Sequence, residues 1–115
     1  MKFSESLKKN KDFQNVYRNG KSCANRNLVM YVMENGKSEN RLGISVSKKV
    51  GNSVVRHHLT RLIRESYRLN EEKFLCGKDI VVVVRVNAKD ISFHDMQSSL
   101  LHISGIQKIL KKEMV

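Results

Sequence analysis

The stretch RLGISVSKKVGNSVVRHHLTRLIRESYR, residues 41–68, decides the fold, because a strand pattern, a glycine-containing loop and a helix pattern follow one another in it. Residues 41–47 alternate strictly between apolar and small or polar side chains, which predicts a strand with one face on a core. From Asn52 or Ser53 onward the apolar side chains recur every three to four residues, which predicts a helix that runs to about Phe74.

Weaker patterns on either side complete the arrangement. Residues 10–19 predict a helix that Asn10 caps and Gly20 ends in a left-handed conformation, and residues 28–34 predict a strand. Residues 79–86 are apolar on both faces and predict an interior strand, and Ser92 caps a last helix. The predicted order is helix, two or three strands, helix, strand and helix. This order indicates one α/β (α+β) domain over residues 1–115, a two-layer sandwich around one small sheet.

The composition points to a polyanionic partner. The chain has 115 residues, with 22 Lys and Arg against 11 Asp and Glu, and a formal net charge of +11. Such an excess favours nucleic acid. A membrane is not expected, because the longest apolar run, IVVVV at 80–84, has only the length of a strand, and the start MKFSESLKKN has no apolar signal core.

The cysteines and histidines do not have metal-site spacing. Cys23 and Cys76 lack a neighbouring ligand or a CxxC motif, so we expect two free thiols in a reducing cytoplasm. His57 and His58 are adjacent and would point about 100° apart on a helix. We therefore expect no metal held by the protein and no catalytic residue of its own.

The polar side of the helix within 51–68 carries the strongest functional signal. Residues 41–68 contain seven Lys or Arg and one acid, Glu65, so +6 of the net charge lies in about a quarter of the chain. A charged helix face is often simply solvated. Here, however, Arg64 and Arg68 are like charges one turn apart, and we expect Glu65 to pair with Arg61 alone. The pattern therefore predicts phosphate binding by the polar side, which comprises Arg56, His57, Thr60, Arg61, Arg64 and Arg68.

The loop before this helix strengthens the prediction. SKKVGN, residues 47–52, places two lysines and a glycine turn just before a helix N-terminus, whose free N–H groups suit a phosphate. The loop is not a Walker motif, because GxxxxGK[ST] is absent, and the chain has no GxGxxG.

An aromatic group suggests a second binding surface. Phe13 and Tyr17 lie one turn apart on the first predicted helix, and Tyr31 lies on a strand expected beside it. Core packing is one explanation. The other is a platform on which unpaired bases stack, with Ser45 and Ser47 as its floor.

With these features in view, the chain resembles the protein subunit of bacterial ribonuclease P. The resemblance rests on LKKNKDFQNVYRNG, CANRNLVMY, RLGISVSKKVGNSVVRHHLTRLIRESYR and DIVVVVR, of which SVSKKVGNSVVR followed by RLIRE is the most specific part. It implies an α/β sandwich with a left-handed βαβ crossover at the basic helix. Spacing alone would not suggest that hand, since right-handed crossovers dominate.

The resemblance also implies a function. In this family a catalytic RNA subunit with bound Mg²⁺, held mainly by the RNA, cleaves the 5′ leader from precursor tRNA. The protein is then a non-catalytic, cytoplasmic subunit of a tRNA-processing endoribonuclease. Its expected partners are ribonuclease P RNA and precursor tRNA with its 5′ leader, without an obligate protein partner.

The resemblance assigns residues to two surfaces. The leader-binding cleft would comprise Phe13, Tyr17, Val29, Tyr31, Ser45 and Ser47. The surface for the catalytic RNA would comprise Lys48, Lys49, Gly51, Asn52, Arg56, Arg61 and Arg64. The helix periodicity adds His57 and Arg68, and the alignment of RHHLTR with the basic motif of the family adds His58.

One departure from the family pattern stands out. The family motif reads Arg-Asn-Arg-x-x-Arg with a lysine before the last arginine, whereas this chain reads RHHLTR. His57, His58 and Thr60 therefore stand where Asn, Arg and Lys are usual, and two cations are missing near pH 7. Because imidazoles gain charge as pH falls below neutrality, we predict RNA affinity that rises from about pH 7.5 to 6.

Two other functions share some of these features. A structural RNA-binding protein, such as a small ribosomal protein, would have the charge and the fold class without a single-strand cleft. A stand-alone nuclease would need catalytic residues, and the chain shows no Ser/His/Asp order, no GxSxG and no carboxylate cluster spaced for two metals.

Overall fold

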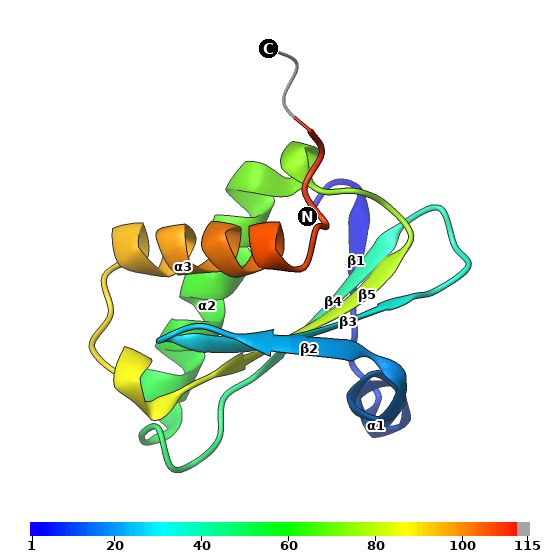
Figure 1. Cartoon of the computed structure of the whole chain (residues 1–115). Coiled ribbons are helices and arrows are strands. Elements are labelled where there is room, and N and C mark those ends of the chain that lie inside the picture. The colour runs from blue at the N-terminus through cyan, green and yellow to red at the C-terminus, as the bar shows by residue number, and fades with distance from the viewer. Residues whose placement is uncertain (113–115) are drawn as a thin grey trace.

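The computed structural model describes residues 1–112. Its regular elements follow the predicted order, with one extra strand at the N-terminus and two short 3₁₀ turns (Figure 1). The elements are β1 (Ser4–Ser6), α1 (Asn10–Asn19), β2 (Lys21–Ala24), β3 (Leu28–Glu34), β4 (Asn40–Ser45), α2 (Ser53–Asn70), the turn Glu71–Lys73, β5 (Lys78–Val84), the turn Val86–Ala88 and α3 (Phe93–Ile106).

The strands form one five-stranded sheet in the order β1-β4-β5-β3-β2. β5 runs parallel to β4 and antiparallel to β3, which confirms that the apolar segment 79–86 supplies an interior strand. α2 connects β4 to β5, so these elements make a βαβ unit of adjacent parallel strands. The left hand of this crossover stays a prediction.

The helices lie on both faces of the sheet. α2 and α3 pack on one face and form the main core, with fully buried Met30, Leu59, Ile63, Ile80 and Leu100. α1 packs on the opposite face over a smaller apolar cluster (Figure 1). The α+β class is confirmed, and α1 adds a partial third layer to the two predicted, because β5 is apolar on both faces and requires cover on both.

The predicted helix ends differ from the structure in three places. α2 ends at Asn70 and a 3₁₀ turn over Glu71–Lys73 follows it, so the helix does not run to Phe74. The N-cap of α1 is Lys9 without a side-chain hydrogen bond, so Asn10 is not the cap. Gly20 has an extended backbone with φ −80°, not a left-handed one. A glycine is nevertheless required there, because a β-carbon would lie 2.5 Å from the carbonyl oxygen of Val16. Ser92 does cap α3, accepting a hydrogen bond from the Asp95 N–H at 3.1 Å.

Strand β1 was not predicted. Its three residues, SES, have no apolar pattern, and contacts distant in sequence hold the segment in place. The buried Glu71 carboxylate accepts hydrogen bonds from the N–H groups of Lys2 and Phe3 at 2.7 and 2.9 Å, and the Ser4 and Tyr67 hydroxyls are 2.8 Å apart. Among residues 1–112, no helix has the length and apolar character needed to cross a membrane.

Candidate nucleic-acid interface

The two sides of α2 separate as the periodicity predicts. Leu59, Ile63 and Tyr67 are buried against the sheet and α3, whereas Arg61 and Arg64 are exposed. The helix starts at the predicted cap, because the Asn52 side chain accepts a hydrogen bond from the Val55 N–H at 3.0 Å. The packing of the apolar side therefore fixes the direction in which the arginines project.

The one acid on this face pairs differently from the prediction. Glu65 forms its ion pair with Arg68, one turn ahead, and not with Arg61. The hydrogen bond from Arg68 lowers the pKa of Glu65, and the carboxylate in turn raises the pKa of Arg68. Within residues 1–112, neither Arg61 nor Arg64 takes part in an ion pair. Their charge remains available to an external anion.

Arg41 does not belong to this positive surface, although the charge count for residues 41–68 included it. Its guanidinium donates to both carboxylate oxygens of Asp79, at 2.8 and 2.5 Å, and lies 3.5 Å from Asp12 of α1. Asp79 is nearly fully buried, and although burial alone would raise its pKa, hydrogen bonds from Arg41 and Asn35 hold that pKa below 3.8. Arg41 therefore ties α1 to the sheet.

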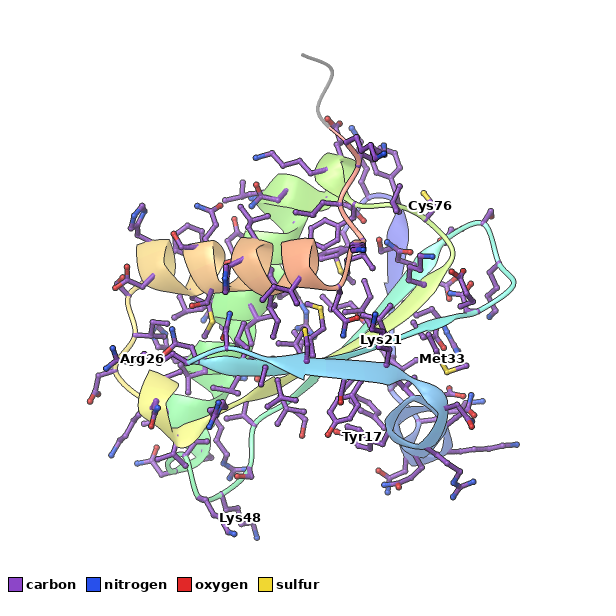
Figure 2. The ribbon with its side chains drawn as sticks, in the orientation of Figure 1. Tyr17, Lys21, Arg26, Met33, Lys48 and Cys76 are labelled. Carbon is purple, nitrogen blue, oxygen red and sulfur yellow. The ribbon has the colours of Figure 1, made fainter. Side chains whose placement is uncertain are left out.

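The loop 46–52 carries two exposed lysines. Val50 is buried and anchors the loop, and its N–H donates to the Ser47 carbonyl at 3.1 Å in a tight turn. Lys48 extends from the body of the protein near the start of α2 (Figure 2), and Lys49 is also exposed. Gly51 allows close approach, because a β-carbon there would lie 2.8 Å from the Val55 side chain.

The predicted RNA-binding residues in the first turns of α2 have different surroundings. Arg56 is half-buried, and its Nε is buried without a hydrogen-bond partner among residues 1–112. Thr60 is half-buried, and its hydroxyl donates to the Arg56 carbonyl one turn earlier in the same helix, at 2.9 Å. His57 lies beside Arg61, whereas His58 lies at a different hollow. The polar side is therefore not one uniform stripe.

The aromatic residues come together on the other face of the sheet. Phe13 and Tyr17 have ring centroids 6.3 Å apart, and Tyr17 meets Tyr31 edge-on at 5.0 Å. Figure 2 shows Tyr17 on the side of α1 that faces the sheet. The Phe13 ring lies directly on Gly43, where a β-carbon would be 2.7 Å from its Cζ atom. The glycine therefore sets how deeply Phe13 sits.

A shallow groove of about 330 Å³ opens beside these rings. Of the residues assigned to the leader-binding cleft, Phe13, Tyr17 and Ser45 line the groove, whereas Val29, Tyr31 and Ser47 are not part of its lining. Asn10, Gln14 and Ile44 also line it, although the sequence did not assign them to the cleft. Only the periodicity of α1 could have indicated Gln14, since positions 10, 13, 14 and 17 share one helix face.

The sheet register places Val29 on the α1 face of the sheet, and Ser47 lies beyond the paired residues of β4. Val29 pairs with Val83, which pairs with Ser45, so the three half-buried residues form one row across the sheet on the α1 face. β4 ends at Ser45, so the predicted extension of the strand to Ser47 was wrong and Ser47 lies in the loop. The buried Val50 accounts for this early end, since the turn that buries it takes the chain off the sheet.

The family model described as Ribonuclease P matches residues 1–108. The chain belongs to the ribonuclease P family. The relative from Lachnoclostridium phytofermentans, named ribonuclease P protein component, is 58% identical over 107 residues, covering 93% of this chain and 92% of the relative. The relative of the same name from Alkaliphilus metalliredigens is 46% identical over 110 residues, covering 96% and 99%.

Solved structures of the ribonuclease P family share the fold. The RNase P protein from Staphylococcus aureus superposes with a TM-score of 0.86 at 44% identity, covering 92% of this chain and 97% of that one. The protein from Thermotoga maritima superposes with a TM-score of 0.80 at 33% identity, covering 85% and 93%. Membership of this family supports a role in tRNA processing and implies a partnership with ribonuclease P RNA.

Proposed function

We propose that this chain is the non-catalytic protein subunit of a cytoplasmic ribonuclease P that removes the 5′ leader of precursor tRNA. α2 and the loop before it bind the catalytic RNA, and the groove beside α1 binds the single-stranded leader. The observation that carries the proposal is the exposed cationic side of α2, where Arg61 and Arg64 have no ion-pair partner within residues 1–112. A folded polyanion supplies the counter-charge that the protein does not.

The groove supports the second half of the proposal. Half-buried aromatic rings next to exposed amides suit unpaired bases, which stack on rings and donate or accept hydrogen bonds along their edges. The groove lies on the α1 face of the sheet and α2 packs on the other, and the loop 46–52 joins them. One protein can therefore contact two RNA segments at once.

The residues do not fit a metal held by the protein alone. Among residues 1–112, no group of three or more His, Cys, Asp and Glu side chains is placed to hold a metal ion. We therefore assign Mg²⁺, which supplies charge neutralisation and an activated water in phosphodiester hydrolysis, mainly to the RNA. This chain contributes binding and positioning.

Reconstitution tests the proposal. The pure protein, in vitro transcribed ribonuclease P RNA and precursor tRNA are combined at low Mg²⁺, with each component omitted in turn. We expect leader cleavage only when protein and RNA are both present. Cleavage by the protein alone would indicate a stand-alone nuclease, and RNA binding without any effect on cleavage would indicate a structural RNA-binding protein.

Tyr17→Ala tests the role of the groove independently of the role of α2. The variant should weaken binding of precursor tRNA with a leader, at about 1–3 kcal/mol for a lost base stack, and leave mature tRNA binding unchanged. It should not alter the salt dependence of affinity, because it removes no charge. If the variant unfolds, which far-ultraviolet circular dichroism would reveal, Tyr17 serves mainly to pack the core.

A further inference from the structure

A hollow of about 330 Å³ lies on the outer side of α2. Its lining comes entirely from that helix, from His57, Arg61, Arg64 and Glu65. Positions 57, 61 and 64 are one turn apart in sequence and share one helix face, so the imidazole and the two guanidinium groups surround the same space. Each group carries N–H donors, the kind of group that binds phosphate oxygens.

The acid in this hollow does not neutralise it. Glu65 accepts two hydrogen bonds from Arg68, and these draw its carboxylate toward the C-terminal end of the helix. Within residues 1–112, no hydrogen bond or ion pair holds the side chains of His57, Arg61 or Arg64. Two uncompensated arginines at i, i+3 repel each other, and an anion placed between them relieves that repulsion.

His58 has different neighbours although it is the next residue. It lines a separate hollow with Val54, Val55, Lys89, Asp90 and Ile91 at the 3₁₀ turn that precedes α3. No arginine lines that hollow, and an acid, Asp90, does. The two adjacent histidines therefore differ in what they can bind, which the sequence alone did not distinguish.

We propose that His57, Arg61 and Arg64 bind one phosphate group of the RNA backbone, and that His57 takes up a proton when the phosphate binds. A neutral imidazole has a single N–H, whereas the imidazolium form donates from both nitrogens, and a phosphodiester supplies the negative charge that favours this form. The inference rests on the proposed function, because the phosphate belongs to the ribonuclease P RNA. It assigns the pH dependence of RNA binding to His57 and not to His58.

The test measures the affinity of the purified protein for in vitro transcribed ribonuclease P RNA at pH 6.0 and 7.5 over a range of salt. Wild-type binding should tighten at the lower pH by about three- to tenfold, below the limit of about tenfold per pH unit for one proton. The log-log salt slope should steepen by less than the roughly 0.7–0.9 expected for one further phosphate, because Arg61 and Arg64 already contact the same phosphate.

Two substitutions of His57 should each abolish the pH dependence of RNA affinity, one by removing the imidazole and one by replacing it with a permanent charge. His57→Ala should have the same affinity and the same salt slope at both pH values. His57→Arg carries a permanent charge and should bind at both pH values as wild type binds at pH 6.0. His57 is exposed in the second turn of α2, and circular dichroism would verify that each variant stays folded.

His58→Ala is the matched control and should keep the wild-type pH response. The inference is overturned if wild-type affinity does not change with pH, if His57→Ala keeps the response, or if His58→Ala loses it. An unrelated structured RNA of equal length separates this result from the proposed function. Equal affinity for both RNAs, with a pH response that still depends on His57, would reject the proposed partner and retain the phosphate site.

Discussion

Replacing Arg41 with methionine tests the charge network that holds α1 to the sheet. In the native protein the guanidinium bridges both oxygens of Asp79, whose side chain is only 2% exposed. After the substitution the carboxylate keeps one side-chain donor, Asn35 at 3.0 Å, in a site closed to water. Breaking a buried pair from one side costs about 3–5 kcal/mol. Because the Arg41 side chain is itself 19% exposed, we expect about 3 kcal/mol, from the lower end of that range.

The loss should depend on pH with a defined sign. The pKa of Asp79 in the folded protein lies below its ordinary 3.8, so the native pair stabilises the fold above that pH and loses its effect as pH falls through the folded-state pKa. In Arg41→Met, burial raises the pKa of Asp79, so the carboxylate destabilises the fold at neutral pH and is protonated on acidification. The difference between the two proteins should therefore be largest at about pH 7, begin to shrink as pH falls through the raised pKa of Asp79 in the variant, and shrink further toward the lowered pKa of Asp79 in the native protein.

Urea denaturation followed by circular dichroism at pH 7 and pH 3.5 measures this difference. Arg18→Met is the matched control, because Arg18 is exposed on α1 and has no ion pair within residues 1–112. Adding Asp79→Asn to Arg41→Met should recover stability at pH 7, since it removes the buried charge. A loss below about 1 kcal/mol at pH 7, or the same loss at both pH values, would refute the reasoning.

Substitutions at four further positions test the site and its supports. Arg61→Ala should flatten the log-log salt dependence of RNA affinity by at most about one unit, because Arg64 lines the same hollow, and Arg68→Ala should flatten it by less, because Glu65 already holds that guanidinium. Gly43→Ala should displace the Phe13 ring, cost about 1–3 kcal/mol in urea denaturation and weaken binding of leader-containing substrate more than mature tRNA. Asn52→Ala should cost about 1 kcal/mol in the same denaturation assay by removing the cap of α2, and Asn52→Ser should restore most of it.

The sequence predicted the start and the buried face of α2, because the information for both is local, but it placed the end of the helix about one turn too late. The spacing of the apolar side chains sets which face is buried, and Asn52 sets the start of the helix. The predicted ion-pair partner of Glu65, Arg61, was wrong, although Arg61 and Arg68 lie on the same helix as Glu65. An acid N-terminal to its cation is the favoured order along a helix, which favours the pair with Arg68 over one with Arg61. The prediction used only the spacing of the residues and not their order.

The position of Arg41 could not be predicted in the same way. Alternation along the strand placed it on the polar face, which is correct, but its partner depends on sheet register. Asp79 lies directly opposite Arg41 on β5, and Asp12 reaches the same guanidinium from α1. A periodic pattern in one strand carries no information about which residue of a distant strand stands beside it.

The two proposed RNA surfaces meet at the carboxyl end of β4, and the reason is topological. Ser45 ends that strand at the groove, and Ser53 begins α2 on the opposite side of the sheet, so residues 46–52 carry the chain from one surface to the other. Lys48 and Lys49 are exposed on this loop between the two surfaces, and the buried Val50 fixes its backbone. The turn that buries Val50 ends β4 before Ser47, and it thereby places the two lysines between the groove proposed for the leader and the helix proposed for the catalytic RNA.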